Sequence, residues 1–130
     1  MTSSDRDPKK PALKVLVVED ELLIGMDLVM ELEDWGYDAN GPHKSVAEAL
    51  SEIEQFAPDV AILDVNLGNG VTSMPIAKKL KEANIPFVFL TGYDPSRFDS
   101  DGLWEAAPRL RKPIILNQLH DTLKQIAPTA

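Results

Sequence analysis

Charged and hydroxyl side chains follow four apolar runs of the sequence, at the points where strands would end. Glu19 and Asp20 follow the first run, Asp64 follows the second, Thr91 ends the third, and Lys112 follows the last. Because the carboxyl ends of parallel strands meet at one edge of a sheet, we expect these five side chains to lie close together. Taken singly, each has an ordinary structural explanation, such as the acidic first turn of a helix or a solvated charge. Their joint placement favours a common site.

The types of these side chains indicate phosphoryl transfer assisted by a divalent cation. Three carboxylates and one ammonium group leave two negative charges, and an all-oxygen set of ligands suits Mg²⁺, or Mn²⁺, better than zinc. The cation and Lys112 would draw charge from the phosphoryl oxygens, while Thr91 would donate a hydrogen bond to one of them. Asp64, on the predicted central strand, is the candidate nucleophile because carboxylates form acyl phosphates.

The elements that must position these residues alternate along the chain. Strands are predicted over residues 13–18, 37–39, 60–63 and 86–91 and around Leu110. Helices are predicted over residues 21–35, from a cap at Ser45 to a stop before Pro58, over residues 74–83, and from a cap at Asn117 onward. Residues 92–107 contain few apolar anchors for a helix. The alternation predicts five strand–helix units that form an α/β fold, a doubly wound parallel sheet with helices on both faces.

Composition narrows the class of protein further. The 130 residues carry a formal net charge of −8, and 44% of them are hydrophobic, so we expect one globular domain over residues 13–126. Residues 1–12 are predicted to form a disordered polar tail, and residues 127–130 a short C-terminal tail. The acidic balance argues against binding to DNA or to an anionic membrane, since both need clustered Lys and Arg. The absence of Cys and of an apolar leader leads us to expect a cytoplasmic protein.

The motifs around these residues resemble those of the receiver domain of bacterial response regulators, the phosphoacceptor module of two-component signalling. Val17-Val18-Glu19-Asp20-Glu21 is similar to the acidic opening of that family, and Ile62-Leu63-Asp64-Val65-Asn66-Leu67 is similar to its phosphorylation strand. Thr91 matches the family's switch hydroxyl, and Lys112-Pro113 matches its Lys-Pro pair. The resemblance covers roughly residues 13–126. It implies a flavodoxin-like (βα)5 fold with a five-stranded sheet in the order 2-1-3-4-5.

The resemblance also implies roles for individual residues. Asp64 would be phosphorylated by a sensor histidine kinase or a histidine phosphotransfer protein. Asp20, Asp64 and the carbonyl of Asn66 would bind Mg²⁺ directly, with Glu19 acting mainly through a bound water. Lys112 would pair with the phosphoryl group, and the peptide bond before Pro113 would be cis.

One segment resembles a subgroup of the family. Residues 86–93, Pro-Phe-Val-Phe-Leu-Thr-Gly-Tyr, are similar to the signature of the alphaproteobacterial "FAT GUY" receivers, although Leu90 replaces the usual Ala. Arg109 stands where most receivers have an aromatic switch residue, three positions before the Lys. We therefore expect phosphorylation of Asp64 to pull Thr91 inward and to order residues 92–107, with Tyr93 or Arg109 taking the signalling role of the usual aromatic residue. The usual dimer is not expected, which favours a monomer.

Three apolar residues directly after the acidic cluster cannot all face one side of a helix, so some of them should lie near the site. Leu22 and Leu23, with Pro113, are predicted to contact the phosphotransfer partner. With no output domain in the sequence, we expect a single-domain regulator that acts as a phosphorelay shuttle, a phosphate sink or a phosphorylation-dependent adaptor. The resemblance to the subgroup implies that it acts in a stress response. It would dephosphorylate itself without being an enzyme on an external substrate.

Two alternatives remain open at this point. A pseudo-receiver would bind partners without phosphorylation, but it should have lost some of the acidic, hydroxyl and ammonium residues, and none is missing. A phosphatase with an aspartyl nucleophile would also use Mg²⁺ at the edge of a parallel sheet. That class needs a second Asp two residues after the nucleophile, where this chain has Asn66.

Overall fold

Five parallel strands form one sheet in the order β2-β1-β3-β4-β5. The structure is a computed structural model and describes residues 12–92 and 102–128. The strands are β1 (Lys14–Val18), β2 (Asp38–His43), β3 (Val60–Asp64), β4 (Phe87–Thr91) and β5 (Arg109–Arg111). The predicted flavodoxin-like sheet and its strand order are confirmed.

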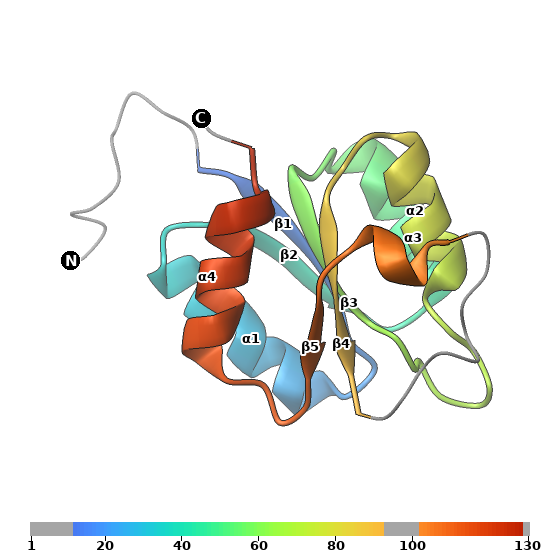
Figure 1. The fold of residues 1–130 in the computed structure, drawn as a ribbon, viewed down its shortest axis with the longest axis horizontal. Helices are drawn as coiled ribbons and strands as arrows, with labels where there is room; N and C mark the ends of the chain where they lie inside the picture. The colour runs from blue at the N-terminus through green and yellow to red at the C-terminus, as the bar shows by residue number, and fades with distance from the viewer. Residues whose placement is uncertain (1–11, 93–101, 129–130) are drawn as a thin grey trace.

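Helices cover both faces of the sheet. They are α1 (Leu22–Asp34), α2 (Val46–Gln55), α3 (Met74–Glu82) and α4 (Leu116–Ile126). Figure 1 shows α1 and α4 on one face and α2 and α3 on the other. Between β4 and β5 the described residues contain a short 3-10 helix, η3 (Trp104–Ala106), and most of the segment expected to hold a helix lies outside the described residues. No helix in the described part of the chain is long and apolar enough to cross a membrane.

Alternate residues of the central strands build two separate cores, which explains their continuous apolar runs. The core under α2 and α3 takes one set of strand side chains, namely Leu16, Val18, Ala61, Leu63, Phe87 and Phe89. The core under α1 and α4 takes the other set, namely Val15, Val17, Val60, Ile62, Val88 and Leu90. Because both faces are covered, β3 and β4 are buried along their whole length, and their ends are held in fixed positions.

Most predicted boundaries agree closely with the structure, and two differ from it. β2 runs to His43 rather than ending at residue 39, because an edge strand tolerates Gly41 and Pro42 where a central strand would not. Asn117 does not cap the last helix. Ile115 is the N-cap of α4, since Leu119 is wholly buried and its N–H already donates to the Ile115 carbonyl, 3.1 Å away. The predicted Ser45 cap of α2 is confirmed, because its Oγ accepts the N–H of Glu48 at 3.2 Å.

Candidate functional site

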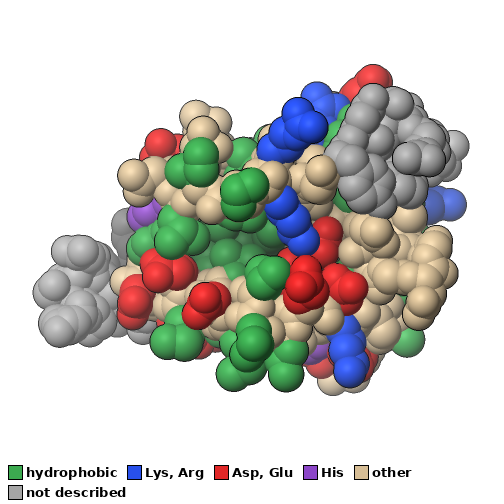
Figure 2. Space-filling model, turned by 90° about the horizontal axis from the view of Figure 1, so that it is seen from below, with side chains coloured by type: hydrophobic (Ala, Val, Ile, Leu, Met, Phe, Trp, Pro, Cys, Tyr) green, Lys and Arg blue, Asp and Glu red, His purple; other side chains and the backbone are tan. Residues whose placement is uncertain are grey.

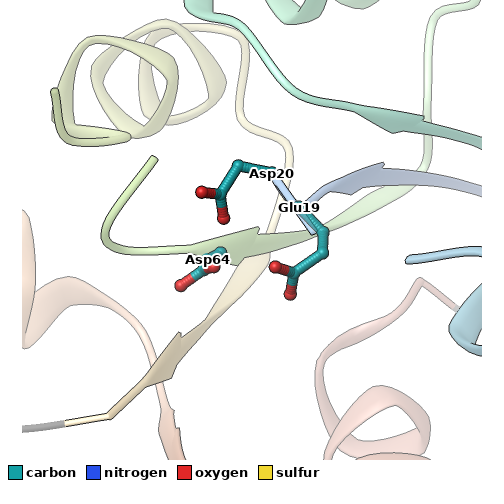
Figure 3. Close-up of side chains that lie close together, drawn as sticks. All are labelled: Glu19, Asp20 and Asp64. Carbon is teal, nitrogen blue, oxygen red and sulfur yellow. The ribbon is translucent and has the colours of Figure 1, made fainter. Parts of the chain in front are cut away.

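Three carboxylates meet at the carboxyl ends of β1 and β3. Glu19 and Asp20 follow β1, and Asp64 is the last residue of β3. One oxygen of each side chain lies within 4.8 Å of the others, and Figure 3 shows the three groups around the two strand ends. Glu19 and Asp64 are buried, with 1% and 4% of their surface exposed, and Asp20 is the most exposed of the three. Adjacent parallel strands thus concentrate negative charge at one edge of the sheet.

Lys112 lies across from the two buried carboxylates. Its Nζ donates a hydrogen bond to Asp64 Oδ2 at 3.0 Å and lies 3.5 Å from Glu19 Oε1. The backbone fixes its place, because the Lys112 N–H donates to the Thr91 carbonyl at 2.8 Å just beyond the end of β5. The peptide bond between Lys112 and Pro113 is cis, as the resemblance implied. Four of the residues singled out from the sequence therefore form one cluster.

The pKa values of the cluster indicate a shortage of positive charge. Burial, together with the charge of Asp64, raises the pKa of Glu19 to about 7. Burial also raises the pKa of Asp64, although Lys112 opposes this. Burial alone would lower the pKa of Lys112, but its hydrogen bond to Asp64 and the two carboxylate charges raise it instead. A single ammonium group does not neutralise three carboxylates.

One buried oxygen of Glu19 identifies what the cluster lacks. Oε2 accepts the N–H of Glu21 at 3.2 Å, whereas Oε1 has no hydrogen-bond partner among the described residues. A buried carboxylate oxygen is normally hydrogen-bonded or bound to a cation. The oxygen-only ligand set of Glu19, Asp20 and Asp64 fits a hard divalent cation such as Mg²⁺.

Thr91 and Asn66 lie beside this cluster. Thr91 is the buried last residue of β4, whose neighbour Leu90 is in register with Asp64. Asn66 follows Asp64 by two residues and is exposed, and its Oδ1 accepts the N–H of Gly68 at 2.9 Å. The role of the Asn66 carbonyl as a metal ligand and that of Thr91 as a switch remain predictions.

Of the two residues predicted to signal with Thr91, the structure describes only Arg109. Tyr93 lies outside the described residues. Arg109 packs on Trp104, with its guanidinium carbon 4.9 Å from the centroid of the indole ring and its Nη1 3.3 Å from the Trp104 carbonyl. Trp104 in turn stacks on Phe89 of β4. Sequence reasoning missed this contact, because an Arg five residues from a Trp outside a helix carries no periodic signal.

Exposed apolar side chains surround the charged edge. Leu22 and Leu23 are 63% and 79% exposed, and Pro113 is also exposed. The structure adds exposed residues that the sequence did not indicate, namely Met26 of α1 and Ile115 and Leu116 at the start of α4. Figure 2 shows hydrophobic side chains on either side of a group of acidic side chains with a basic one next to it. We call Leu22, Leu23, Met26, Ile115 and Leu116 the apolar rim.

The fold and the charged cluster together define the family. Residues 15–124 match the response regulator receiver domain, and the chain belongs to this family. Receiver domains generally bind Mg²⁺ at an acidic pocket and typically interact with histidine kinases or phosphotransfer proteins.

Individual members of the family show which proteins the chain is similar to. It is 32% identical to the phyllosphere-induced regulator PhyR of Methylorubrum extorquens, over 78% of this chain and 39% of PhyR. It is 36% identical to the sensory transduction protein LytT of Bacillus cereus, over 87% of this chain and 46% of LytT. The chain thus spans less than half the length of these two relatives.

A solved structure matches almost from end to end. The solution structure of SdrG from Sphingomonas melonis Fr1 is 38% identical, covers 90% of this chain and 98% of SdrG, and superposes with a TM-score of 0.73. The similarity to PhyR and SdrG supports the FAT GUY subgroup that residues 86–93 indicated.

Proposed function

We propose that Asp64 accepts a phosphoryl group from the phosphohistidine of a sensor histidine kinase or a histidine phosphotransfer protein. The observation that carries this proposal is the environment of Asp64. Its carboxylate is buried at a strand end, 3.0 Å from the Lys112 ammonium, and lies within reach of two further carboxylates. A carboxylate in such a place has little structural use, because an apolar residue would be more stable there.

The chain supplies groups for each part of the transfer. A carboxylate oxygen of Asp64 attacks phosphorus, forming an O–P bond as the N–P bond of the phosphohistidine breaks. The bonding electrons of the N–P bond return to the imidazole of the partner, which leaves as neutral histidine once it carries one proton. In this proposal Lys112, 3.0 Å from Asp64, holds the charge of the phosphoryl oxygens, and the buried Thr91 donates a hydrogen bond to one of them.

A divalent cation fits the same site. Glu19, Asp20 and Asp64 would hold Mg²⁺, with the Asn66 carbonyl as a further ligand. Glu19 Oε1 supports this fit, because it is buried, accepts no hydrogen bond among the described residues and has only the Lys112 ammonium, 3.5 Å away, as a charge partner. When bound, the ion supplies positive charge that neutralises the carboxylates and the incoming phosphoryl group. The residues need no further acid or base for this transfer, which supports a phosphoacceptor that loses its phosphoryl group only to water or to a partner.

The apolar rim is the proposed docking surface for the phosphohistidine partner. Leu22 and Leu23 begin α1 directly after the acidic cluster, and Ile115 and Leu116 begin α4 directly after Lys112-Pro113. A partner helix covering the rim would bring its histidine over Asp64 and remove exposed apolar surface from water.

Three signalling roles are consistent with this chemistry. A phosphorelay shuttle passes the phosphoryl group to a second phosphotransfer protein, a phosphate sink loses it to water, and an adaptor binds an effector only when phosphorylated. The similarity to PhyR and SdrG supports signalling of the kind found in the FAT GUY subgroup, for which we propose a stress response.

The test is phosphorylation by a small-molecule phosphodonor, followed by intact-mass measurement with and without Mg²⁺. We expect one phosphoryl group on the wild type in the presence of Mg²⁺ and none on Asp64→Asn. The exposed-surface variant Asp121→Asn serves as a matched control and should be phosphorylated like the wild type. A wild type that binds Mg²⁺ but stays unmodified by both the phosphodonor and a panel of kinases would overturn the proposal.

A further inference from the structure

Gly25 of α1 lies directly against Pro42 of β2, next to Glu19. A Cβ atom at Gly25 would be 2.4 Å from the Pro42 Cβ and 2.6 Å from its Cγ. The same atom would be 3.4 Å from the Cγ of Glu19. Non-bonded carbons attract best at about 3.5–4.0 Å, so no larger residue fits at this position without moving Pro42 or the helix.

The end of β2 closes over the end of β1 at the same point. The Glu19 N–H donates to the His43 carbonyl at 2.9 Å, and the β1–β2 register shifts between Leu16 and Val18. Gly41 adopts a φ of +141°, and a Cβ there would be 2.5 Å from the Val17 carbonyl oxygen. Pro42 is thereby held between the end of β1 and α1.

The N-cap residue of α1 also contacts Glu19. Glu21 donates its N–H to Glu19 Oε2, and the Glu21 carbonyl accepts the N–H of Gly25 at 2.9 Å. Glu19 is therefore linked to α1 twice, through this backbone chain and through the contact of its side chain with Gly25. The other carboxylate oxygen, Oε1, is left facing Lys112, 3.5 Å away.

We propose that Gly25 and Pro42 are positioning residues for Glu19. Their close contact sets the separation of α1 from the end of β2, and this separation holds the Glu19 carboxylate at the place where a divalent cation needs it. Neither side chain carries a group that could bind the cation, so both act through Glu19. The inference deepens the proposed function, since it concerns the metal site on which that function relies.

The experiment is a Mg²⁺ titration by calorimetry and by amide NMR of residues 19–21, on the wild type and four variants of the full chain. Gly25→Ala should weaken Mg²⁺ binding by about 10-fold or more, as loss of outer-shell support does at other metal sites. Helix propensity alone would favour Ala at this position, so a loss is not explained by the helix. Pro42→Gly should also weaken binding, because it leaves a gap beside Glu19. The double variant Gly25→Ala/Pro42→Gly fills that gap with the new methyl group and should recover most of the loss.

Met30→Ala, an exposed change farther along α1, is the matched control and should bind Mg²⁺ like the wild type. Wild-type affinity in Gly25→Ala would overturn the inference, and so would a double variant that binds no better than the single ones. If Gly25→Ala does not fold, Pro42→Gly alone decides, and an unchanged affinity in that variant contradicts the proposal. Failure of phosphorylation in a wild type that binds Mg²⁺ would instead overturn the proposed function and leave this inference standing.

Discussion

The two ends of helix α1 lie in different environments: buried charged side chains at its start and a stack of aromatic rings at its end. At its start, Glu19 and Asp64 are buried with one ammonium group between them and one carboxylate oxygen unsatisfied. At its end, Trp35 stacks on His120 of α4, with ring centroids 4.1 Å apart and planes 2° from parallel. The first end gathers buried charge and the second packs two aromatic rings, although both contain a titratable side chain.

The two titratable groups should change stability with pH in opposite directions. The pKa of Glu19 rises from 4.5 to about 7, so the unfolded chain loses this proton first, and stability falls as pH rises through that interval. Burial, with a smaller effect from Lys124, lowers the pKa of His120 below its ordinary 6.5. The unfolded chain therefore binds that proton first, and stability falls as pH decreases below about 6.5.

Removal of the ammonium group should give the largest change in stability. Lys112→Met leaves two buried carboxylates without their cation, and we expect a loss of about 3 kcal/mol at neutral pH without Mg²⁺. Lys79 offers a matched control, because its Nζ lies 2.9 Å from Glu54 on the surface. Lys79→Met should cost less than about 1 kcal/mol, as exposed pairs do. Urea denaturation of both variants measures the difference, and equal losses would show that burial does not distinguish the two pairs.

Glu19→Gln tests the unsatisfied charge itself. The change keeps the shape of the side chain but removes a charge that is costly to bury, so without Mg²⁺ the variant should gain about 2 kcal/mol over the wild type at pH 8. The gain should vanish as pH falls below 4.5, where the wild-type carboxyl becomes protonated in both the folded and the unfolded state. Denaturation at several pH values checks this. A gain that is the same at both pH values would contradict the raised pKa of Glu19.

The aromatic end should give the smallest effect. His120→Phe preserves a ring beside Trp35 but cannot bind a proton, so it should remove the loss of stability that His120 contributes between pH 7 and pH 5. Placing the change in a Glu19→Gln background removes the opposing trend from the other end of α1. The difference between the two chains is expected to be below about 1 kcal/mol, read from denaturation midpoints at the two pH values. A parallel decline in both would assign the pH dependence to another group.

The central strands and the charged cluster could both be predicted from the sequence, because both depend on the pattern of apolar runs. Continuous apolar runs identify β1, β3 and β4, and parallel topology then places Glu19, Asp64 and Thr91 at one edge. Contacts between residues that are distant in the sequence and follow no periodic pattern could not be predicted. Gly25 against Pro42 and Trp35 against His120 depend on how helices settle on the sheet.

Predictions of element ends from single residues were wrong where tertiary packing determined the end of the strand or the start of the helix. Gly41 and Pro42 indicate the end of a strand, yet β2 continues through them because it lies at the edge of the sheet. Asn117 has the side chain of a good cap, but the burial of Leu119 goes with an N-cap two residues earlier, at Ile115.

The two outer strands of the sheet have a consequence for the behaviour of the protein at high concentration. β2 carries Pro42, which has no N–H to donate, and β5 is three residues long with exposed Arg109 and Arg111 at its ends. Intermolecular strand pairing requires a long row of free donors and acceptors, and charge and proline both discourage it. Both margins of the sheet are thus protected against the edge-to-edge aggregation to which open sheets are prone.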